Sequence, residues 1–160
     1  MKFQIIKNIT VASLVISGLL GCSKNIEVDG NTVDAVYITS TAVTGTGTGA
    51  STTITNSASG KIAQGLATAR VYVNTPKSTD VTINYTLGGT AVAGTNYTIP
   101  APQSVNIPAG KWYADIQIPL INAVLPANRT IIITLASGNG VQLGLGTDRN
   151  YKVFTYTLTN

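Results

Sequence analysis

Apolar and polar residues alternate along much of this chain, and the alternation predicts β-strands. Residues 81–87 (VTINYTL) and 112–120 (WYADIQIPL) show it most clearly, with an apolar residue at every second position. Successive side chains of a strand point to opposite faces of the sheet, so each run offers one apolar face. No segment has the sustained 3.6-residue apolar period that would predict a helix to cover these faces. A second sheet is therefore expected to cover them.

Further strands are expected where β-branched and aromatic residues cluster between turn signals. Proline flanks two short extended pieces and cannot donate to a β-ladder, which predicts a place at a sheet edge for both. Residues 44–60 are rich in glycine, threonine, serine and alanine and are expected to form a long loop or loose hairpin. Together these segments predict an all-β fold, an antiparallel immunoglobulin-like β-sandwich of about 7–9 strands. The further strands cover residues 35–43, 66–73, 129–136, 141–143 and 151–158, and the short pieces cover 97–99 and 104–107.

Residues 1–21 are typical of a segment that is removed during export. A short basic start precedes an uncharged, mostly apolar run at residues 9–20, which is too short for a bilayer that takes about 20 residues to cross. The run ends in Leu-Leu-Gly-Cys22, which resembles the lipobox of bacterial lipoproteins, where the chain is cut before the cysteine and fatty acid such as palmitate is attached. The alternative is an ordinary secretory signal followed by a chance cysteine. Cys22 is the only cysteine of the chain, and we identify it as the lipidation site.

Cleavage before Cys22 divides the rest of the chain into residues 22–33, a polar lipidated tether, and residues 34–160, one β-sandwich domain. Full acylation of Cys22 provides a stable membrane anchor. In lipoproteins of this kind an aspartate after the cysteine signals retention at the inner membrane, and this chain has Ser23 there. The resemblance therefore implies a lipid anchor in the outer membrane and leaves the periplasmic and cell-surface faces both open.

Several motifs in the second half of the chain resemble the Calx-beta domain, an immunoglobulin-like sandwich. Together with the lipobox, they are similar to small uncharacterised lipoproteins of Gram-negative bacteria, which often accompany outer-membrane polysaccharide-uptake systems. The resemblance covers about half of the mature chain and implies a fold, because function depends on the site rather than on the fold. The matching segments are residues 81–85 (VTINY), 89–91 (GTA), 93–97 (AGTNY), 107–110 (IPAG), 116–120 (IQIPL) and 131–135 (IIITL).

Calx-beta domains bind calcium through clustered loop carboxylates, and this chain departs from that pattern. The family has an acidic residue before the tyrosine, where this chain has Asn96. It also has an acidic loop before the penultimate strand, where this chain has residues 122–129 (NAVLPANR). Calcium takes about six to eight oxygen ligands, several of them carboxylates. We therefore expect no calcium, no other metal and no cofactor.

Composition argues against several classes of activity. The chain has no histidine and its one cysteine is the lipidation site, so histidine-assisted nucleophiles and the usual zinc sites are not expected. Its six acidic residues show no pattern of carboxyl groups facing each other across a cleft, as glycosidases need. Basic residues are scattered, so no stripe predicts nucleic-acid binding. Residues 45–50 (GTGTGA) match a dinucleotide fingerprint formally, but a poor helix former follows them. We expect no enzyme.

Aromatic residues are the remaining candidates for ligand binding, because sugar rings stack on aromatic faces. Trp112 has the parity of the buried face and is expected to cover one end of the core, with sugar stacking as the alternative. Tyr113 has the outward parity and is the better stacking candidate. Tyr37 and Tyr72 both oppose the apolar faces of their strands, so they share an exposed surface if those strands pair.

Two hypotheses of different classes follow for the function. The first is a non-enzymatic, surface-displayed binding or adhesion module, accessory to glycan capture, with residues 44–60 and 122–129 as contact loops. The alternative is a structural spacer or subunit of an envelope assembly that engages a partner protein through an exposed edge strand.

Overall fold

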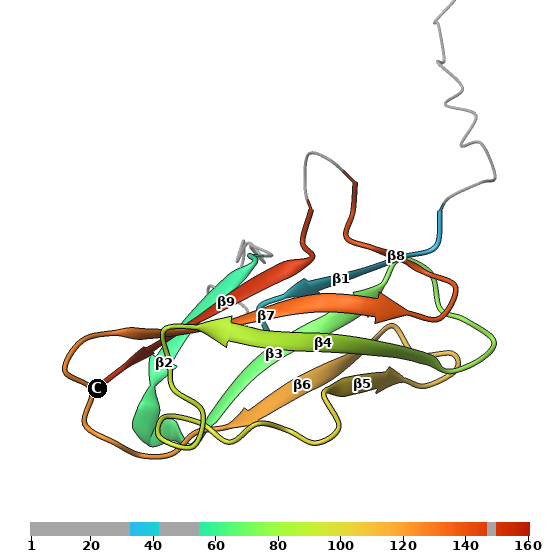
Figure 1. Cartoon of the computed structure of the whole chain (residues 1–160). Coiled ribbons are helices and arrows are strands. Elements are labelled where there is room, and N and C mark those ends of the chain that lie inside the picture. The colour runs from blue at the N-terminus through green and yellow to red at the C-terminus, as the bar shows by residue number, and fades with distance from the viewer. Residues whose placement is uncertain (1–32, 42–54, 147–149) are drawn as a thin grey trace, which may run out of the picture. The chain divides into compact units, whose positions relative to one another are not determined.

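The computed structural model describes residues 33–41, 55–146 and 150–160, which form two facing β-sheets (Figure 1). One sheet has four strands in the order β6-β3-β1-β8, and the other has five in the order β2-β9-β7-β4-β5. The expected all-β sandwich is confirmed. No helix in this part of the chain has the length and apolarity to cross a bilayer. The strands are β1 (Ala35–Thr39), β2 (Ser57–Lys61), β3 (Leu66–Val73), β4 (Val81–Gly89), β5 (Ser104–Ile107), β6 (Tyr113–Pro119), β7 (Arg129–Gly138), β8 (Gln142–Leu143) and β9 (Val153–Thr159), with one 3-10 turn at Ile62–Gln64.

The core lies between the two sheets and is built from the alternating residues of both. In β3 every second residue is buried, from Ala67 to Val73, as the sequence pattern predicted. The five-stranded sheet contributes its largest side chains from β4, β7 and β9, including Ile83, Ile133 and the fully buried Phe154. Removing each such side chain from water stabilises the fold by about 1.5–3 kcal/mol. The two apolar faces therefore shield each other, and no helix is needed.

Two edge pairs depart from the expected antiparallel arrangement. β8 lies parallel to β1, and β2 lies parallel to β9. The β2 strand begins within residues 44–60, which were expected to form a long loop or loose hairpin. That expectation is wrong for residues 57–60, which form an edge strand parallel to β9. Its small and polar residues carry no strand pattern because ladder hydrogen bonds with β9, rather than buried side chains, hold it in place. Residues 44–54 lie outside the described residues.

The proline-flanked pieces differ from each other in the structure. Ser104–Ile107 forms β5, which is an edge strand as predicted. Residues 97–99 do not form a strand, since Tyr97 makes only isolated bridges, to Ala93 and Leu120. The Tyr97 side chain is buried in the core. The apolar residues of 97–99 therefore mark a loop that is held to the core by Tyr97, and not a strand.

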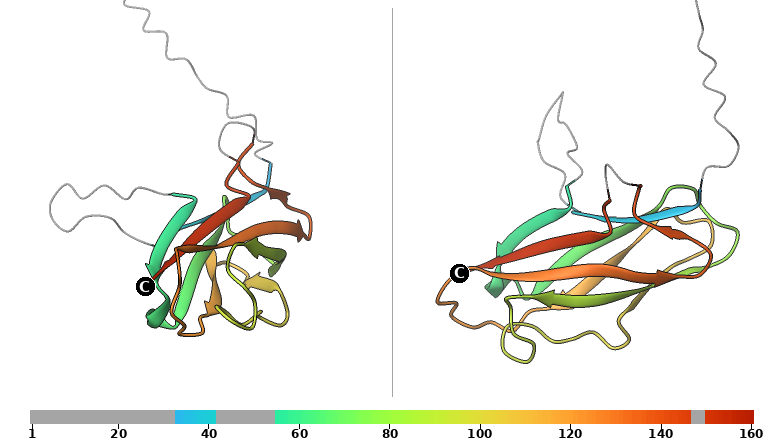
Figure 2. Two further views of the ribbon diagram at one scale, coloured as in Figure 1. Left: turned by 60° about the vertical axis from the view of Figure 1, so that its left-hand side comes forward. Right: turned by 45° about the horizontal axis from the view of Figure 1, so that its top comes forward.

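The sandwich has two ends, which we call the near end and the far end. The near end holds Val33 and the start of β1, together with the turns at residues 74–80, 108–112 and 139–141. The far end holds the loops at residues 90–98 and 120–128, and the C-terminus lies there, opposite the start of β1 (Figure 2).

Side-chain hydrogen bonds brace the near-end turns. The Asp80 carboxylate accepts hydrogen bonds from the Asn106 side chain at 2.8 Å and from the Ala109 N–H at 3.0 Å. These bonds favour the charged carboxylate, so the pKa of Asp80 lies below its ordinary value, chiefly because of Asn106.

Candidate functional site on the tyrosine face

Three tyrosines lie side by side across the outer face of the four-stranded sheet. The register places Tyr37 on β1 opposite Tyr72 on β3, and Tyr72 opposite Tyr113 on β6. The rings of Tyr37 and Tyr72 stack with centroids 5.4 Å apart and an interplanar angle of 13°. Those of Tyr72 and Tyr113 are also 5.4 Å apart but tilted by 54°. We call these three residues the tyrosine row.

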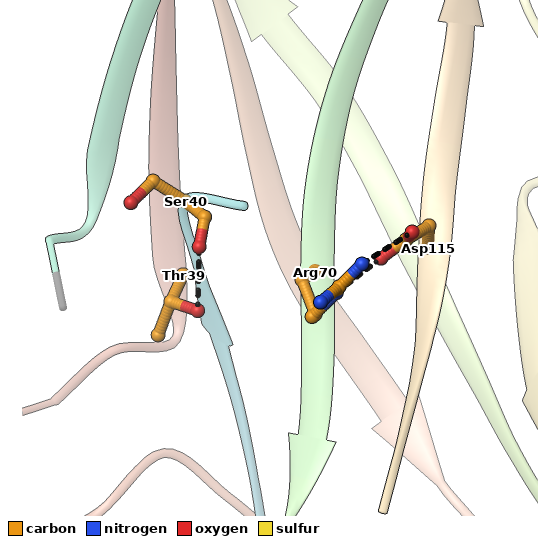
Figure 3. A network of polar contacts seen from close by, with 4 residues as sticks. All are labelled: Thr39, Ser40, Arg70 and Asp115. Atoms are coloured by element: carbon orange, nitrogen blue, oxygen red, sulfur yellow. Dashed lines mark hydrogen bonds and ion pairs between the residues drawn. The ribbon is translucent and has the colours of Figure 1, made fainter. Parts of the chain in front are cut away.

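An arginine and an aspartate lie in the next register position of the same face. Arg70 on β3 is opposite Asp115 on β6, and Figure 3 shows the guanidinium reaching across to the carboxylate. Arg70 Nε donates to Asp115 Oδ1 at 2.7 Å, and Nη2 donates to Oδ2 at 2.9 Å. The guanidinium carbon also lies 3.9 Å from the ring centroid of Tyr113. The bond to Asp115 raises the pKa of Arg70 further, so the arginine stays charged and is held against the tyrosine row.

The exposed parts of the tyrosine row determine what it can bind. Tyr113 lies at the sheet edge and is 45% exposed, whereas Tyr37 and Tyr72 are half-buried. Tyr37 and Tyr72 stack on each other, so one face of each ring is unavailable to a ligand, and Tyr113 has the most exposed ring of the three. Burial raises the pKa of Tyr37, so its hydroxyl remains a donor at neutral pH. Aromatic surface next to hydroxyls and a fixed ion pair suits a ligand with both C–H faces and hydroxyl groups.

Trp112 does not belong to the tyrosine row. It lies one residue before β6, where its carbonyl accepts the Val73 N–H at 2.9 Å. The alternation of β6 groups it with Ala114, away from the side of Tyr113. The expectation that it covers the core is wrong, since 56% of its surface is exposed. Trp112 stands at the very end of the β3–β6 ladder, one residue before β6 begins, and the burial that strand parity predicts does not hold there.

The outer edge of β6 presents backbone groups that the sheet does not use. The pairing with β3 directs the N–H and C=O groups of Trp112, Ala114, Ile116 and Ile118 toward β3. Those of Tyr113, Asp115 and Gln117 therefore point outward, and no backbone bond joins them to another described segment. The next outward carbonyl, that of Pro119, accepts the Thr98 N–H at 2.9 Å. This edge is the candidate for strand addition.

A shallow depression of about 310 Å³ lies at the near end and is lined by Val33, Ala35, Asn74, Gln142, Gly144, Leu145 and Gly146. Its main polar side chain is already used inside the protein. Asn74 Oδ1 accepts the Ala35 N–H at 2.9 Å, and its Nδ2 donates to the Val33 carbonyl at 2.9 Å. With these atoms satisfied, we assign no ligand to the depression.

The far-end loops do not fit a calcium site. Asn96 is buried, and its side-chain oxygen accepts the Val92 N–H at 2.8 Å, so it braces its own loop. The guanidinium of Arg129 approaches the Thr90 carbonyl at 3.4 Å. Across the described ranges, no three His, Cys, Asp or Glu side chains form a group that would hold a metal. Oxygen ligands with several carboxylates, as calcium requires, are not assembled here.

Comparisons with known proteins bear on the fold. No family model and no curated protein match the chain. Among solved structures, the chain is similar to CBD12 from CALX1.2, with 22% identity and a TM-score of 0.54 over 64% of this chain and 41% of that one. It is similar to the calcium binding domain CBD12 of CALX1.1, with 22% identity and a TM-score of 0.53 over 64% of this chain and 40% of that one. The fold is Calx-beta-like.

A third similar structure, the apo-form Calx CBD1 domain, has 21% identity and a TM-score of 0.51 over 64% of this chain and 88% of that one. The chain thus spans about two fifths of the length of each CBD12 structure and matches most of the single domain. At these identities the likeness establishes the Calx-beta-like fold alone.

The sequence predicted that Tyr37 and Tyr72 share a surface if their strands pair, and the β1–β3 register places them opposite each other. Tyr113 was named separately, and the Arg70–Asp115 pair was missed. The alternation of residues 112–120 places Asp115 on the same face as Tyr113, whereas Arg70 carried no signal. Their pairing depends on the register between β3 and β6, and the two residues lie 45 positions apart in the chain. Cys22, the predicted lipidation site, lies outside the described residues.

Proposed function

We propose that this protein is a non-enzymatic binding module, anchored in the outer membrane by lipid on Cys22, that captures glycan on the tyrosine row. The observation that supports it is the alignment of Tyr37, Tyr72 and Tyr113 beside the Arg70–Asp115 pair on one open sheet face. Such a module acts by presenting a binding surface: the lipid holds the protein at the membrane, and the strands hold the tyrosine row in place.

The chemistry of the row matches a sugar ring. C–H groups of a pyranose pack on the exposed ring of Tyr113, while vicinal hydroxyls bond to the tyrosine hydroxyls and to the outer atoms of the Arg70–Asp115 pair. Because strands rather than loops carry all five side chains, little ordering is required when the ligand binds. The solved neighbours named calcium binding domains lend this chain no calcium role, since its loops lack the carboxylates.

The test is glycan-array screening followed by calorimetry with the best glycan. Tyr113→Ala is expected to weaken binding about tenfold, which corresponds to about 1.4 kcal/mol. Tyr113→Phe keeps the ring and separates stacking from hydrogen bonding. Thr86→Ala, on an exposed position of β4 in the other sheet, is the control and should leave binding unchanged. Unaltered affinity in Tyr113→Ala, with the fold intact by circular dichroism, would refute the assignment.

The second candidate is a structural subunit that accepts a strand from an envelope protein, and the free edge of β6 favours it. Gln117→Pro removes an outward N–H that β3 does not use, so it blocks strand addition while sparing the existing ladder. Gln117→Ala keeps the N–H and is the matched control. If the first variant alone loses an envelope partner in co-purification, and no glycan binds the wild type, the structural role replaces the binding role.

A further inference from the structure

The near end exposes apolar side chains at both of its sides. Trp112 and Val33 each expose 56% of their surface, and Leu145 is exposed as well. Lys111, next to Trp112, is also exposed. Trp112 is the only tryptophan of the chain. Tryptophan is highly buried on average in folded proteins, so its exposure here calls for an explanation.

Backbone and side-chain bonds hold this end rigid. Asn74 links β3 to the chain entering β1, through the Val33 carbonyl and the Ala35 N–H. The Gly110 N–H donates to the Lys77 carbonyl at 2.8 Å, which ties the turn before Trp112 to the turn after β3. The exposed side chains therefore sit on a fixed base.

Among the described residues of the near end, the charges balance. Lys77 forms an ion pair with Asp34, and the other two charged side chains are Lys111 and Asp80. A balanced surface with an exposed indole suits the interfacial layer of a bilayer, where tryptophan places its apolar ring among the lipids and its N–H toward water. Attraction to anionic headgroups is a minor contribution.

The attachment point of the tether favours lipid over other occupants. Ten residues separate Cys22 from Val33, and ten extended residues span at most about 35 Å. A lipid on Cys22 therefore keeps the near end, where Val33 lies, close to the membrane at high effective concentration. The far end has exposed apolar residues too, such as Val124, but the length of the domain separates it from the tether.

We propose that the near end rests on the surface of the anchoring membrane, with Trp112 in the interfacial layer. This contact rests on the lipid anchor of the proposed function and adds an orientation to it. The strands then rise from the bilayer, and the tyrosine row, which begins with the first residue of β6, lies just above the lipid surface.

The experiment uses the acylated protein in vesicles and the fluorescence of its single tryptophan. Vesicles of phosphatidylcholine contain lipids brominated either near the headgroup or deep in the chains. The matched reporter is the double variant Trp112→Phe with Val124→Trp, which moves the indole to a far-end position that is 92% exposed. We expect Trp112 to emit at shorter wavelength and to be quenched by the shallow bromines, with the far-end reporter quenched by aqueous iodide only.

The outcomes separate the contact from the anchor. Strong iodide quenching of Trp112 in vesicles, or equal lipid quenching of both reporters, overturns the contact. A tryptophan shift that depends on protein concentration without vesicles assigns the surface to a second copy and also overturns it. Adding phosphatidylglycerol should change the quenching little.

Mass spectrometry tests the anchor independently, and a mature chain without the mass of the acyl groups refutes the anchor itself. For the chain produced without acylation, Trp112→Ala should lower vesicle affinity on the order of tenfold.

Discussion

The contacts of Arg70 on the tyrosine face can be measured as coupling free energies. The perturbation is a pair of double-mutant cycles, one removing Arg70 and Asp115 and one removing Arg70 and Tyr113, each to alanine singly and together. The first cycle isolates the two-pronged ion pair, and the second isolates the guanidinium over the ring. Both partners of the ion pair are partly shielded, with side-chain exposures of 24% and 27%.

The geometry sets the expected magnitudes. Exposed ion pairs contribute about 0.2–1 kcal/mol, and only those with good geometry reach the upper end. Bonds of 2.7 and 2.9 Å in a parallel pair place Arg70–Asp115 there, so we expect a coupling of about 1 kcal/mol. The contact with Tyr113 at 3.9 Å should add about 0.5–1 kcal/mol. The Lys77–Asp34 pair, whose aspartate side chain is 48% exposed, is the control and should couple by less than about 0.5 kcal/mol.

The assay is urea unfolding followed by far-UV circular dichroism, with stability taken from linear extrapolation. The measurements are repeated at about 0.1 M and about 1 M NaCl, because the Debye length falls from about 10 Å to about 3 Å. The ion-pair coupling should shrink in high salt. A coupling near zero at low salt, or one no larger than that of Lys77–Asp34, would refute the reasoning that Arg70 is fixed against the tyrosine row.

Three further predictions concern the scaffold. Phe154→Ala should lower the unfolding free energy by about 3–5 kcal/mol because the ring is fully buried. Val124→Ala should change it by less than about 0.5 kcal/mol because Val124 is exposed, and chemical denaturation of both variants measures the difference. Gly89 has a φ of 106°, and an added Cβ would lie 2.2 Å from a carbonyl oxygen of β7. Gly89→Ala should therefore destabilise the fold by more than about 1 kcal/mol. Gly88→Ala, where an added Cβ meets open space, should be tolerated, and thermal melts of the two variants compare them. The carboxylate of Asp80 has a pKa lowered in the folded state, so its stabilising effect is present above the ordinary value of 3.8 and is lost as pH falls through the lowered pKa. The melting-temperature gap between wild type and Asp80→Ala should therefore close as pH falls below 3.8, and a gap that persists in strong acid would contradict the assignment.

Local sequence determined most of the strands and their inward faces. The burial of alternate residues in β3, β4, β7 and β9 follows the sequence pattern, because a strand exposes its side chains with a period of two whatever its neighbours are. The proline-flanked edge strand β5 was likewise readable, since proline lacks the N–H that an inner strand requires. The sandwich class follows from the same local rule, applied to a chain without amphipathic helices.

Pairing between distant strands was decided only by the tertiary structure. The row of Tyr37, Tyr72 and Tyr113, and the Arg70–Asp115 pair beside it, exist because the registers of β1, β3 and β6 align these positions. A shift of one residue would send every side chain to the opposite face, and no local pattern encodes which residues lie opposite each other. β2 and Trp112 show the same limit: ladder bonds with β9 make a strand of small polar residues, and the end of the β6 ladder leaves an indole in solvent.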